Sequence, residues 1–423
     1  MAAENKNKMK NSGLEWIEGL PETWQEIPNR YLFIDHSVKV GEQWKDYQLL
    51  SLTTSGVKEK DVNAGGGKVP DSYENYQTVE IGDMIFCLFD LDCSAVFSGL
   101  SNYNGMITSA YDVFMPNSKY LNNLYADYWF QYVFSNRYYK MYSKNIRYTV
   151  TTEMFKSILT PIPPLDEQRK IGEFLLEKDK QIAELIANQQ AQIEKLKEYK
   201  QSVITEAVTK GLDKSAPLKP SGIEWIGEIP AHWEVSNLGN LLKEHKQPND
   251  EVNSNALQFK FGTIIRKKEQ NLTPDVVEML SKYNIVEPNI IMVNGLNLAF
   301  DFVTQRVAIV EEEGVITSTY LAMKPTSLAN PKYFTYLLKS YDYQKALHAM
   351  GRGLRSVLSY EAFRKEKVLL PKLVEQQQIV DYLDEKCAKI DRLIAIKQEK
   401  IEKLQEYKKS LIYEYVTGKK EVG

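Results

Sequence analysis

Apolar side chains recur in steps of three and four along two long stretches of the chain, residues 166–210 and residues 372–418. Steps of this size place the apolar positions on one face of a helix. The first stretch contains no proline and a single glycine. A helix along it would be roughly 68 Å long at 1.5 Å per residue.

Each predicted helix carries one apolar stripe, and a long helix of this kind is unstable in water without a partner. We therefore expect the two helices to pair as a coiled coil, and to run antiparallel if the two halves of the chain are related by a twofold axis. The alternative is that each stripe packs on its own globular domain. The positions predicted to line the helix pair are Ile182, Leu185, Ile186, Ile193, Leu196, Val203, Ile390, Leu393, Ile394, Ile401, Leu404 and Leu411.

Two features of these stretches predict irregular helices. Asp179 and Lys386 lie where a short first helix is expected to break from a longer second one. Gly172, which the C-terminal copy replaces with Val380, predicts a local bend, because glycine costs about 1 kcal/mol inside a helix.

The segment before each helical stretch alternates between turns and short apolar runs. The turn dipeptides Gly82-Asp83 and Pro288-Asn289 lead into runs typical of buried strands. Helical patterns follow at residues 124–136 and 331–340. The sequence therefore predicts an α+β protein with two mixed α/β globular domains, joined by a long antiparallel two-helix coiled coil.

The two halves of the chain repeat one pattern. Residues 12–24 read SGLEWIEGLPETW, and residues 221–233 read SGIEWIGEIPAHW, an offset of 209. Later, IEKLKEYKQSVI at residues 193–204 returns as IEKLQEYKKSLI at residues 401–412, an offset of 208. So constant an offset indicates a duplicated architecture with internal symmetry, although two tandem domains that make no use of symmetry would give the same pattern.

Composition limits the class of protein without giving its function. Hydrophobic residues make up 43% and charged residues 26% of the chain, as is usual for a globular protein, and no apolar run reaches the roughly 18 residues of a membrane span. The three cysteines form no CxxC pair, which favours the reducing cytoplasm.

The distribution of charge argues against indiscriminate binding of polyanions, because the net charge is −3. Residues 235–371 contain 17 Lys/Arg and 14 Asp/Glu, whereas residues 26–163 contain 12 and 15. Any affinity for DNA would have to come from local patches or from partner proteins.

Several motifs occur in the same order in both halves. The halves open with two forms of one pattern, SGLEW–IEGLP–ETW and SGIEW–IGEIP–AHW. The helices begin with PPLDEQRKIGEFL and KLVEQQQIVDYLDEKCAKIDRLI, and the first helix ends with ITEAVTKGL. This ordered set resembles the specificity subunits of type I restriction–modification systems over essentially the whole chain beyond residue 12. The polar, Lys/Asn-rich start of the chain predicts a flexible tail at residues 1–12. The resemblance implies target recognition domains at residues 13–163 and 213–371, and helical spacers at residues 164–212 and 372–418.

The resemblance further implies that each recognition domain reads one half of a bipartite target in double-stranded DNA, while the helices set the gap. The implied partners are two modification subunits, which methylate adenine with S-adenosylmethionine, and restriction subunits with nuclease and translocase activity. S-adenosylmethionine, ATP and Mg are expected on these partners. The chain itself is expected to bind no cofactor or metal and to catalyse nothing.

No motif in the sequence indicates catalysis. The run at residues 65–68, GGGK, is followed by Val-Pro and therefore lacks the helix of a phosphate-binding loop. The four histidines have no metal-ligand spacing. Residues 330–333, NPKY, lack the second proline of an adenine methyltransferase motif and indicate a helix start instead. A coiled-coil adaptor, a fused nuclease or methyltransferase, and a specificity subunit of another defence system remain as alternatives.

Base reading requires Arg, Lys, Asn or Gln on a rigid platform, and phosphate contacts require cations nearby. Candidates occur in the loops that precede the predicted helix starts at residues 151–153 and 359–361, in the loops after the central strands, and in two basic groups. A single residue of this kind is more often an ordinary surface charge than a base contact, but as groups these residues favour DNA binding. The predicted DNA-binding residues are Lys58, Lys60, Asp90, Asp92, Lys144, Asn145, Arg147, Arg266, Lys267, Lys268, Asn294, Asn297, Arg352 and Arg355.

Overall fold

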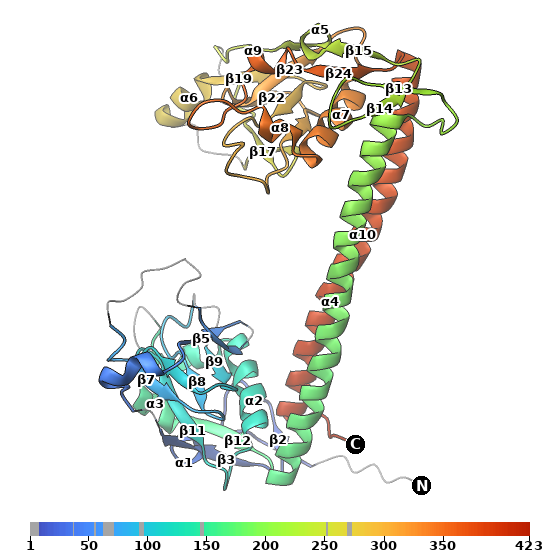
Figure 1. Ribbon diagram of the computed structural model, residues 1–423. Coiled ribbons are helices and arrows are strands. Elements are labelled where there is room, and N and C mark those ends of the chain that lie inside the picture. The colour runs from blue at the N-terminus through green and yellow to red at the C-terminus, as the bar shows by residue number, and fades with distance from the viewer. Residues whose placement is uncertain are drawn as a thin grey trace, which may run out of the picture. The chain divides into compact units, whose positions relative to one another are not determined.

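The computed structural model describes residues 8–36, 38–54, 56–61, 72–92, 97–143, 148–250, 253–268 and 273–423. The chain divides into two compact units (Figure 1). Unit 1 comprises residues 1–189 and 399–423, and unit 2 comprises residues 190–398. The two long helices are α4 (Leu165–Lys210) and α10 (Leu373–Val416), and each contributes one part to each unit.

Unit 1 alternates short strands with short helices before α4 begins. Its elements are β1 (Met9–Lys10), β2 (Leu20–Pro21), β3 (Gln25–Pro28), α1 (Asn29–Leu32), β4 (Phe33–Asp35), η1 (Gly41–Asp46), β5 (Leu50–Thr53), β6 (Gly56–Glu59), β7 (Gln77–Val79), β8 (Met84–Phe86), β9 (Ser98–Leu100), β10 (Gly105–Ile107), β11 (Asp112–Pro116), α2 (Asn123–Ser135), η2 (Tyr138–Tyr142), α3 (Thr152–Ser157) and β12 (Leu159–Ile162).

Unit 2 follows a similar succession between α4 and α10. Its elements are β13 (Leu218–Pro220), β14 (Glu228–Pro230), β15 (Glu234–Asn237), α5 (Leu238–Leu241), β16 (Leu242–Glu244), β17 (Leu257–Lys260), β18 (Thr263–Arg266), α6 (Pro274–Ser281), β19 (Tyr283–Val286), β20 (Ile291–Val293), β21 (Val307–Ile309), β22 (Gly314–Thr317), β23 (Leu321–Pro325), α7 (Pro331–Tyr343), α8 (Ala346–Ala349), α9 (Tyr360–Phe363) and β24 (Lys367–Leu370).

The strand pairings confirm the duplication that the sequence predicts. The central antiparallel sheet has the order β4-β11-β8-β9 in unit 1 and β16-β23-β20-β21 in unit 2. The smaller pairs correspond in the same way, since β3 pairs with β12 as β15 pairs with β24, and β7 pairs with β10 as β19 pairs with β22. Both units are therefore mixed α/β domains of one architecture.

The central strand of each sheet is buried on both faces, which explains its continuous apolar run. In unit 1, Met84 and Phe86 pack into the cluster that contains α2, while Ile85 packs into a second cluster with the β5–β6 hairpin. In unit 2, Ile291 and Val293 likewise pack with α7, while Met292 lies on the opposite side. The turn dipeptides before these strands lie where the sequence predicts them.

The Glu-Gln pair at the start of each long helix ties that helix to its domain. In unit 1, Trp24 Nε1 donates to Glu167 Oε1 at 3.0 Å. Gln168 is fully buried; its Nε2 donates to Pro163 O at 2.8 Å, and its Oε1 accepts from Asn122 N, the N-cap of α2, at 2.8 Å. The equivalent bonds in unit 2 are Trp233 to Glu375, Gln376 to Pro371 and Asn330 to Gln376.

The predicted breaks at Asp179 and Lys386 are wrong, because α4 and α10 run continuously through both residues. Gly172 also lies inside the continuous α4, and its surroundings explain the glycine. A Cβ at this position would lie 2.7 Å from Leu124 Cβ and 3.1 Å from Tyr125 N. Close approach of α2, rather than a bend, requires the missing side chain.

Candidate nucleic-acid interface

Within unit 1, the start of α4 runs antiparallel to the end of α10. The rings of Phe174 and Tyr415 lie 4.6 Å apart, and Lys408 Nζ lies 2.5 Å from Asp179 Oδ1. Later positions on α4 thus meet earlier positions on α10, which defines the antiparallel direction within this unit.

Unit 2 contains the corresponding antiparallel pair, made by the end of α4 and the start of α10. Lys397 Nζ donates to Gln192 Oε1 at 2.5 Å, and Lys200 Nζ lies 2.7 Å from Asp391 Oδ2. The direction is again antiparallel, as predicted for the helices.

Each helix presents a seam of buried and half-buried positions whose steps alternate between four and three residues, a heptad spacing. On α4 the seam is Ile182, Ile186, Gln189, Ile193, Leu196, Lys200, Val203 and Ala207, and on α10 it is Ile390, Ile394, Lys397, Ile401, Leu404, Lys408, Leu411 and Tyr415.

Two of the residues predicted to line the helix pair lie outside this seam. Leu185 is 44% exposed and Leu393 is 47% exposed. Each directly precedes a seam position, and one residue of helix rotates a side chain by roughly 100° away from the seam. The assignment of these two leucines to the interface is therefore corrected.

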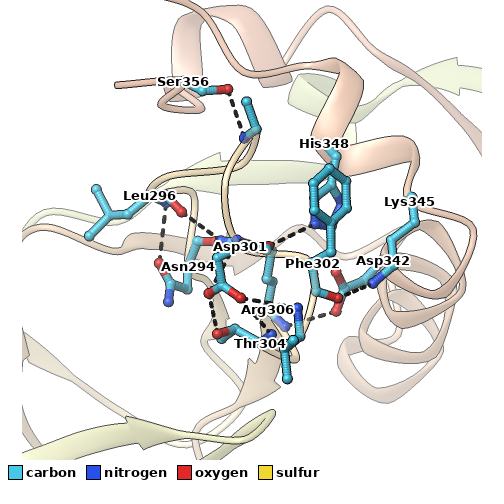
Figure 2. A network of polar contacts seen from close by, with 12 residues as sticks. Asn294, Leu296, Asp301, Phe302, Thr304, Arg306, Asp342, Lys345, His348 and Ser356 are labelled. Atoms are coloured by element: carbon cyan, nitrogen blue, oxygen red, sulfur yellow. Dashed lines mark hydrogen bonds and ion pairs between the residues drawn. The ribbon is translucent and has the colours of Figure 1, made fainter. Parts of the chain in front are cut away.

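In unit 2, the loop between β20 and β21 folds around the side chain of Arg306 (Figure 2). This guanidinium is 0% exposed, and it donates from Nη1 to Leu296 O at 2.7 Å and to Asn294 O at 3.1 Å. Its Nη2 donates to Asp301 O at 2.6 Å. The buried guanidinium thus donates the hydrogen bonds that these loop carbonyls would otherwise receive from backbone N–H groups in regular secondary structure.

The same loop is fastened to the C-terminal end of α7 and to α8 (Figure 2). Arg306 N donates to Asp342 Oδ2 at 2.8 Å, Lys345 Nζ donates to Phe302 O at 2.7 Å, and His348 Nε2 lies 3.2 Å from Asp301 O. The ring of Phe302 stacks on His348 with centroids 4.9 Å apart. Burial lowers the pKa of His348, which favours its neutral form.

A second loop, between α8 and α9, lies against the first. Leu358 N donates to Gly295 O at 2.8 Å, and Leu298 N donates to Ser356 O at 2.9 Å. The glycine is required here, because a Cβ at Gly295 would lie 2.9 Å from Leu358 Cβ. The two loops therefore form one platform, which we call the unit 2 platform: residues 294–306 and 351–358.

The unit 2 platform brings together four of the predicted DNA-binding residues. Asn297, Arg352 and Arg355 are exposed on it. Asn294 is half-buried, and its Oδ1 accepts from Leu296 N at 3.2 Å, so this side chain also serves the loop itself. Asn and Arg are the side chains that read adenine and guanine in the major groove.

The basic group of unit 2 lies at the end of β18 and makes its contacts elsewhere. Arg266 Nη2 lies 2.6 Å from Glu312 Oε2, and Lys267 Nζ lies 3.4 Å from the hydroxyl of Tyr283. Lys268 is exposed. Among the described residues, these contacts link the group to the segments around β21 and β19 rather than to the two platform loops.

Unit 1 contains the counterpart of the platform. Asp90, with φ of 51°, and the exposed Asp92 lie in the loop after β8. That loop packs against the segment before α3, since Val150 N donates to Leu88 O at 2.8 Å and Leu91 N donates to Tyr148 O at 3.3 Å.

The other candidates of unit 1 are more scattered. Lys58, in β6, and Lys60 are exposed on the β5–β6 hairpin. The predicted residues Lys144, Asn145 and Arg147 lie outside the described residues.

The outer loop of the unit 2 platform (residues 351–358) is positively charged, whereas its inner loop (residues 294–306) also contains an acidic residue. Residues 343–360 contain Lys345, Arg352 and Arg355 and no Asp or Glu. The one acid of the inner loop is Asp301, whose pKa falls to about 2, mainly because the Thr304 hydroxyl donates to its carboxylate. This carboxylate is also within 3.6 Å of Arg306, so its charge is partly compensated inside the loop.

Sequence reasoning missed Arg306 and Asp342, although they position the platform. Residue 97, at the offset of 209 that relates β9 to β21, is a phenylalanine, so the internal repeat gives no signal for this arginine. A single arginine that directly precedes an apolar strand, in QRVAIV, is the local signal that could have indicated it. A charge at the edge of a buried strand is uncommon unless it is paired.

The searches for metal ligands and for membrane spans add two findings. Across the residues that the structure describes, no group of three or more His, Cys, Asp or Glu side chains could hold a metal ion. In the same part of the chain, no helix combines the length and the apolar character needed to cross a membrane.

Comparison with known proteins relates this geometry to one family. The family model of the type I restriction modification DNA specificity domain matches residues 103–195 and 230–406. The putative type I restriction enzyme MjaX specificity subunit of Methanocaldococcus jannaschii is 25% identical over 314 residues, 72% of this chain and 69% of that protein. The type I restriction enzyme MjaVIII specificity subunit of the same organism is 27% identical over 290 residues, 64% of each chain.

A solved structure shows the same fold. It concerns complex assembly and conformational transition of the type I R-M system, and one of its chains superposes with a TM-score of 0.67. That chain is 15% identical, and the match covers 94% of the present chain and 99% of the solved one.

Proposed function

Because this chain belongs to the type I restriction modification DNA specificity family and is a specificity subunit of such a system, we propose that it reads a bipartite target in duplex DNA, one half with each unit. The duplicated platform carries this proposal. In both units the loop after the central strand packs against the segment before a short helix. The loops differ in sequence, with Asp90 and Asp92 against Asn294 and Asn297, so the two half-sites would differ too.

In this proposal the paired helices set the distance between the half-sites. Half-sites about one helical turn apart, roughly 34–36 Å, present their major grooves on the same face of the duplex. The apolar seam holds each helix against its partner, and two of the lysines within it, Lys408 and Lys200, are paired with Asp179 and Asp391. A seam that combines apolar and ion-paired positions favours one register over its alternatives.

The expected partners are two modification subunits, together with restriction subunits. A groove in unit 1 and a corresponding groove in unit 2 support a pair of identical partners. In unit 1 it has a volume of about 700 Å³ and is lined by Trp16, Ser410 and Tyr413 among others. In unit 2 it has about 590 Å³, and Trp225, Ser202 and Thr205 occupy the corresponding positions.

The chemistry is assigned to those partners rather than to this chain. S-adenosylmethionine would be bound by the modification subunits, and ATP and Mg by the restriction subunits. The chain would contribute recognition without catalysis, and its DNA substrate would place it in the cytoplasm. Purified alone, it is expected to show no methyltransferase or nuclease activity.

Selection from random duplexes tests the proposal. The chain, assembled with its modification subunits, is used to enrich bound DNA over several rounds, and the enriched pool is sequenced. We expect two short specific segments separated by a fixed number of unspecified base pairs. A pool without sequence preference would support a coiled-coil adaptor instead, and a single continuous motif would contradict reading by two units.

A further inference from the structure

We propose that the unit 2 platform reads its half-site partly through apolar side chains, which contact thymine methyl groups in the major groove. This inference rests on the proposed function and adds the chemistry of recognition to it. Phe300 is 73% exposed, Val303 is 87% exposed and Leu354 is 100% exposed. Single exposed hydrophobic residues need no explanation, but a group of them on one surface marks a binding site.

The three side chains belong to loops that are bonded to each other. Ala299 N, next to Phe300, donates to Ser356 Oγ at 3.2 Å. Leu354 lies at the tip of a tight turn, in which Ser356 N donates to Gly353 O at 2.9 Å and residues 352 and 357 pair as an antiparallel bridge. The tip that carries Leu354 and Arg355 is therefore fixed to the segment that carries Phe300, and Val303 belongs to the same loop as Phe300.

Hydrogen bonds made by the loop backbone hold these side chains in exposed positions. Val303 N and Thr304 N both donate to Asp301 Oδ1, at 3.0 Å and 3.1 Å, and the turn that results projects Val303 outward. Arg306 fixes the same turn from inside through the carbonyl of Asp301 (Figure 2). A rigid loop loses little entropy when it binds, so fixed apolar tips are suited to recognition.

The surrounding charge indicates a polyanion as the ligand. Arg352 and Arg355 flank Leu354, and residues 343–360 contain no acidic residue. A protein partner of the usual apolar kind would not require this cationic surround, whereas duplex DNA offers phosphates on both sides of each groove. Inside the major groove, the apolar group that distinguishes bases is the C5-methyl of thymine.

Replacement of thymine by uracil tests the inference directly, because uracil lacks the methyl group and keeps the same base pairing. Once the target is known, each thymine of both half-sites is replaced singly, and binding to the chain in complex with its modification subunits is measured. In the half-site read by unit 2, we expect at least one replacement to weaken binding about fourfold, the effect of one buried methyl group.

The variant Val303→Ser/Leu354→Ser completes the test. We expect it to bind the thymine duplex at least about tenfold more weakly and to lose the difference between thymine and uracil in that half-site. Its response to uracil in the other half-site should equal that of the unchanged chain, which shows that the protein is folded. Leu328→Ser is the matched control, since Leu328 is 56% exposed in the same unit and precedes the start of α7, whereas the platform is bonded to the end of that helix.

Each outcome decides between the inference and its alternatives. If every uracil duplex binds like its thymine counterpart, the methyl contact is wrong. If the variant binds weakly but uracil has no effect, the apolar side chains act elsewhere, for example between base steps, and the inference is again overturned. If the chain shows no sequence preference in the preceding selection, the proposed function itself fails, and the two failures are thus distinguished.

Discussion

Arg306 donates its backbone N–H to Asp342 Oδ2 at 2.8 Å, while its side chain lies completely buried inside the loop that begins at Asn294. Asp342 belongs to α7, whose Phe334, Leu337 and Leu338 are fully buried in the core of unit 2. The position of the platform is therefore determined by the core. Burial raises the pKa of Asp342, because the carboxylate is removed from water. The hydrogen bond from Arg306 N takes the place of part of that lost hydration.

Replacing Arg306 with methionine should damage both stability and recognition. The change leaves three backbone carbonyls without their donor, and loss of a buried charged partner costs about 3–5 kcal/mol. We expect unit 2 to unfold at lower denaturant concentration and the affinity for its half-site to fall at least about tenfold. Arg364→Met, at an exposed arginine of the same unit, should change stability by less than about 0.5 kcal/mol. Equal stability of the two variants would contradict this role of Arg306.

Replacing Arg355 with alanine should weaken recognition of one half-site only. Arg355 is exposed at the tip of the outer platform loop, and loss of a base contact costs about 1–3 kcal/mol, or roughly five- to 150-fold. Gel-shift assays with either half-site scrambled would measure this, with Arg392→Ala on the exposed face of α10 as the control. If Arg355→Ala lowers binding equally on all DNA, including random sequence, the arginine is a general phosphate contact.

Replacing Gly172 with alanine should destabilise unit 1, although alanine is the better helix former. The new Cβ would lie 2.7 Å from Leu124 Cβ, and overpacking of this kind costs about 1–3 kcal/mol. Asn188→Ala, on the exposed face of the same helix, should be neutral or slightly stabilising. Denaturant unfolding compares the two variants, and a stabilised Gly172→Ala protein would show that the helices do not approach so closely.

Neighbouring apolar residues of α10 should respond very differently to truncation. Ile390 is 4% exposed and lies in the seam, so Ile390→Ala is expected to cost about 2–4 kcal/mol. Leu393 is 47% exposed, and Leu393→Ala should cost less than about 0.5 kcal/mol. Thermal unfolding of both variants checks the assignment, and similar losses would return Leu393 to the interface.

Asp127 should give unit 1 a stability that declines as pH rises. Burial is the main cause that raises the pKa of this carboxyl from 3.8 to about 6, although its Oδ1 accepts from Leu100 N and its Oδ2 from Gln131 Nε2. The folded state holds this proton more tightly than the unfolded state. The stabilisation is therefore complete below pH 3.8 and is lost as pH rises through about 6.

The variant Asp127→Asn tests this pH dependence. It should flatten the stability profile between about pH 4 and 6 and be more stable than the unchanged chain at pH 7 by about 1–2 kcal/mol. Asp46→Asn, on the exposed surface of the same unit, should keep the original profile. A profile for Asp127→Asn with the same slope as the unchanged chain would assign the pH dependence to other groups.

The helices and the duplication could be predicted from the sequence because both are periodic. Heptad steps define a face without knowledge of the partner, and the offset of 208 or 209 shows that whatever one half forms, the other half forms as well. The starts of α7 and α9 were predicted for a similarly local reason, since Asn330 and Ser359 act as N-caps with hydrogen bonds from their own helices.

The rest of the site depends on contacts between residues far apart in the sequence. Periodicity alone placed Leu185 and Leu393 in the interface, because it cannot separate a seam position from the residue beside it. Arg306 is separated by 36 positions from Asp342, and neither residue has a counterpart in the other half. The exposed tips Val303 and Leu354 follow no period either, since loops that determine specificity are free to vary.

A map of adenine methylation tests the central claim, reading of one target by two units, most directly. The chain and the modification subunit encoded beside it are produced together in a host without other methylation, and methylated adenines are located across the whole genome. The account predicts methylation within one bipartite motif with a fixed gap, and a change in one half of that motif alone when Arg355 is replaced. Methylation within a single continuous motif, or a change in both halves from that one substitution, would contradict it.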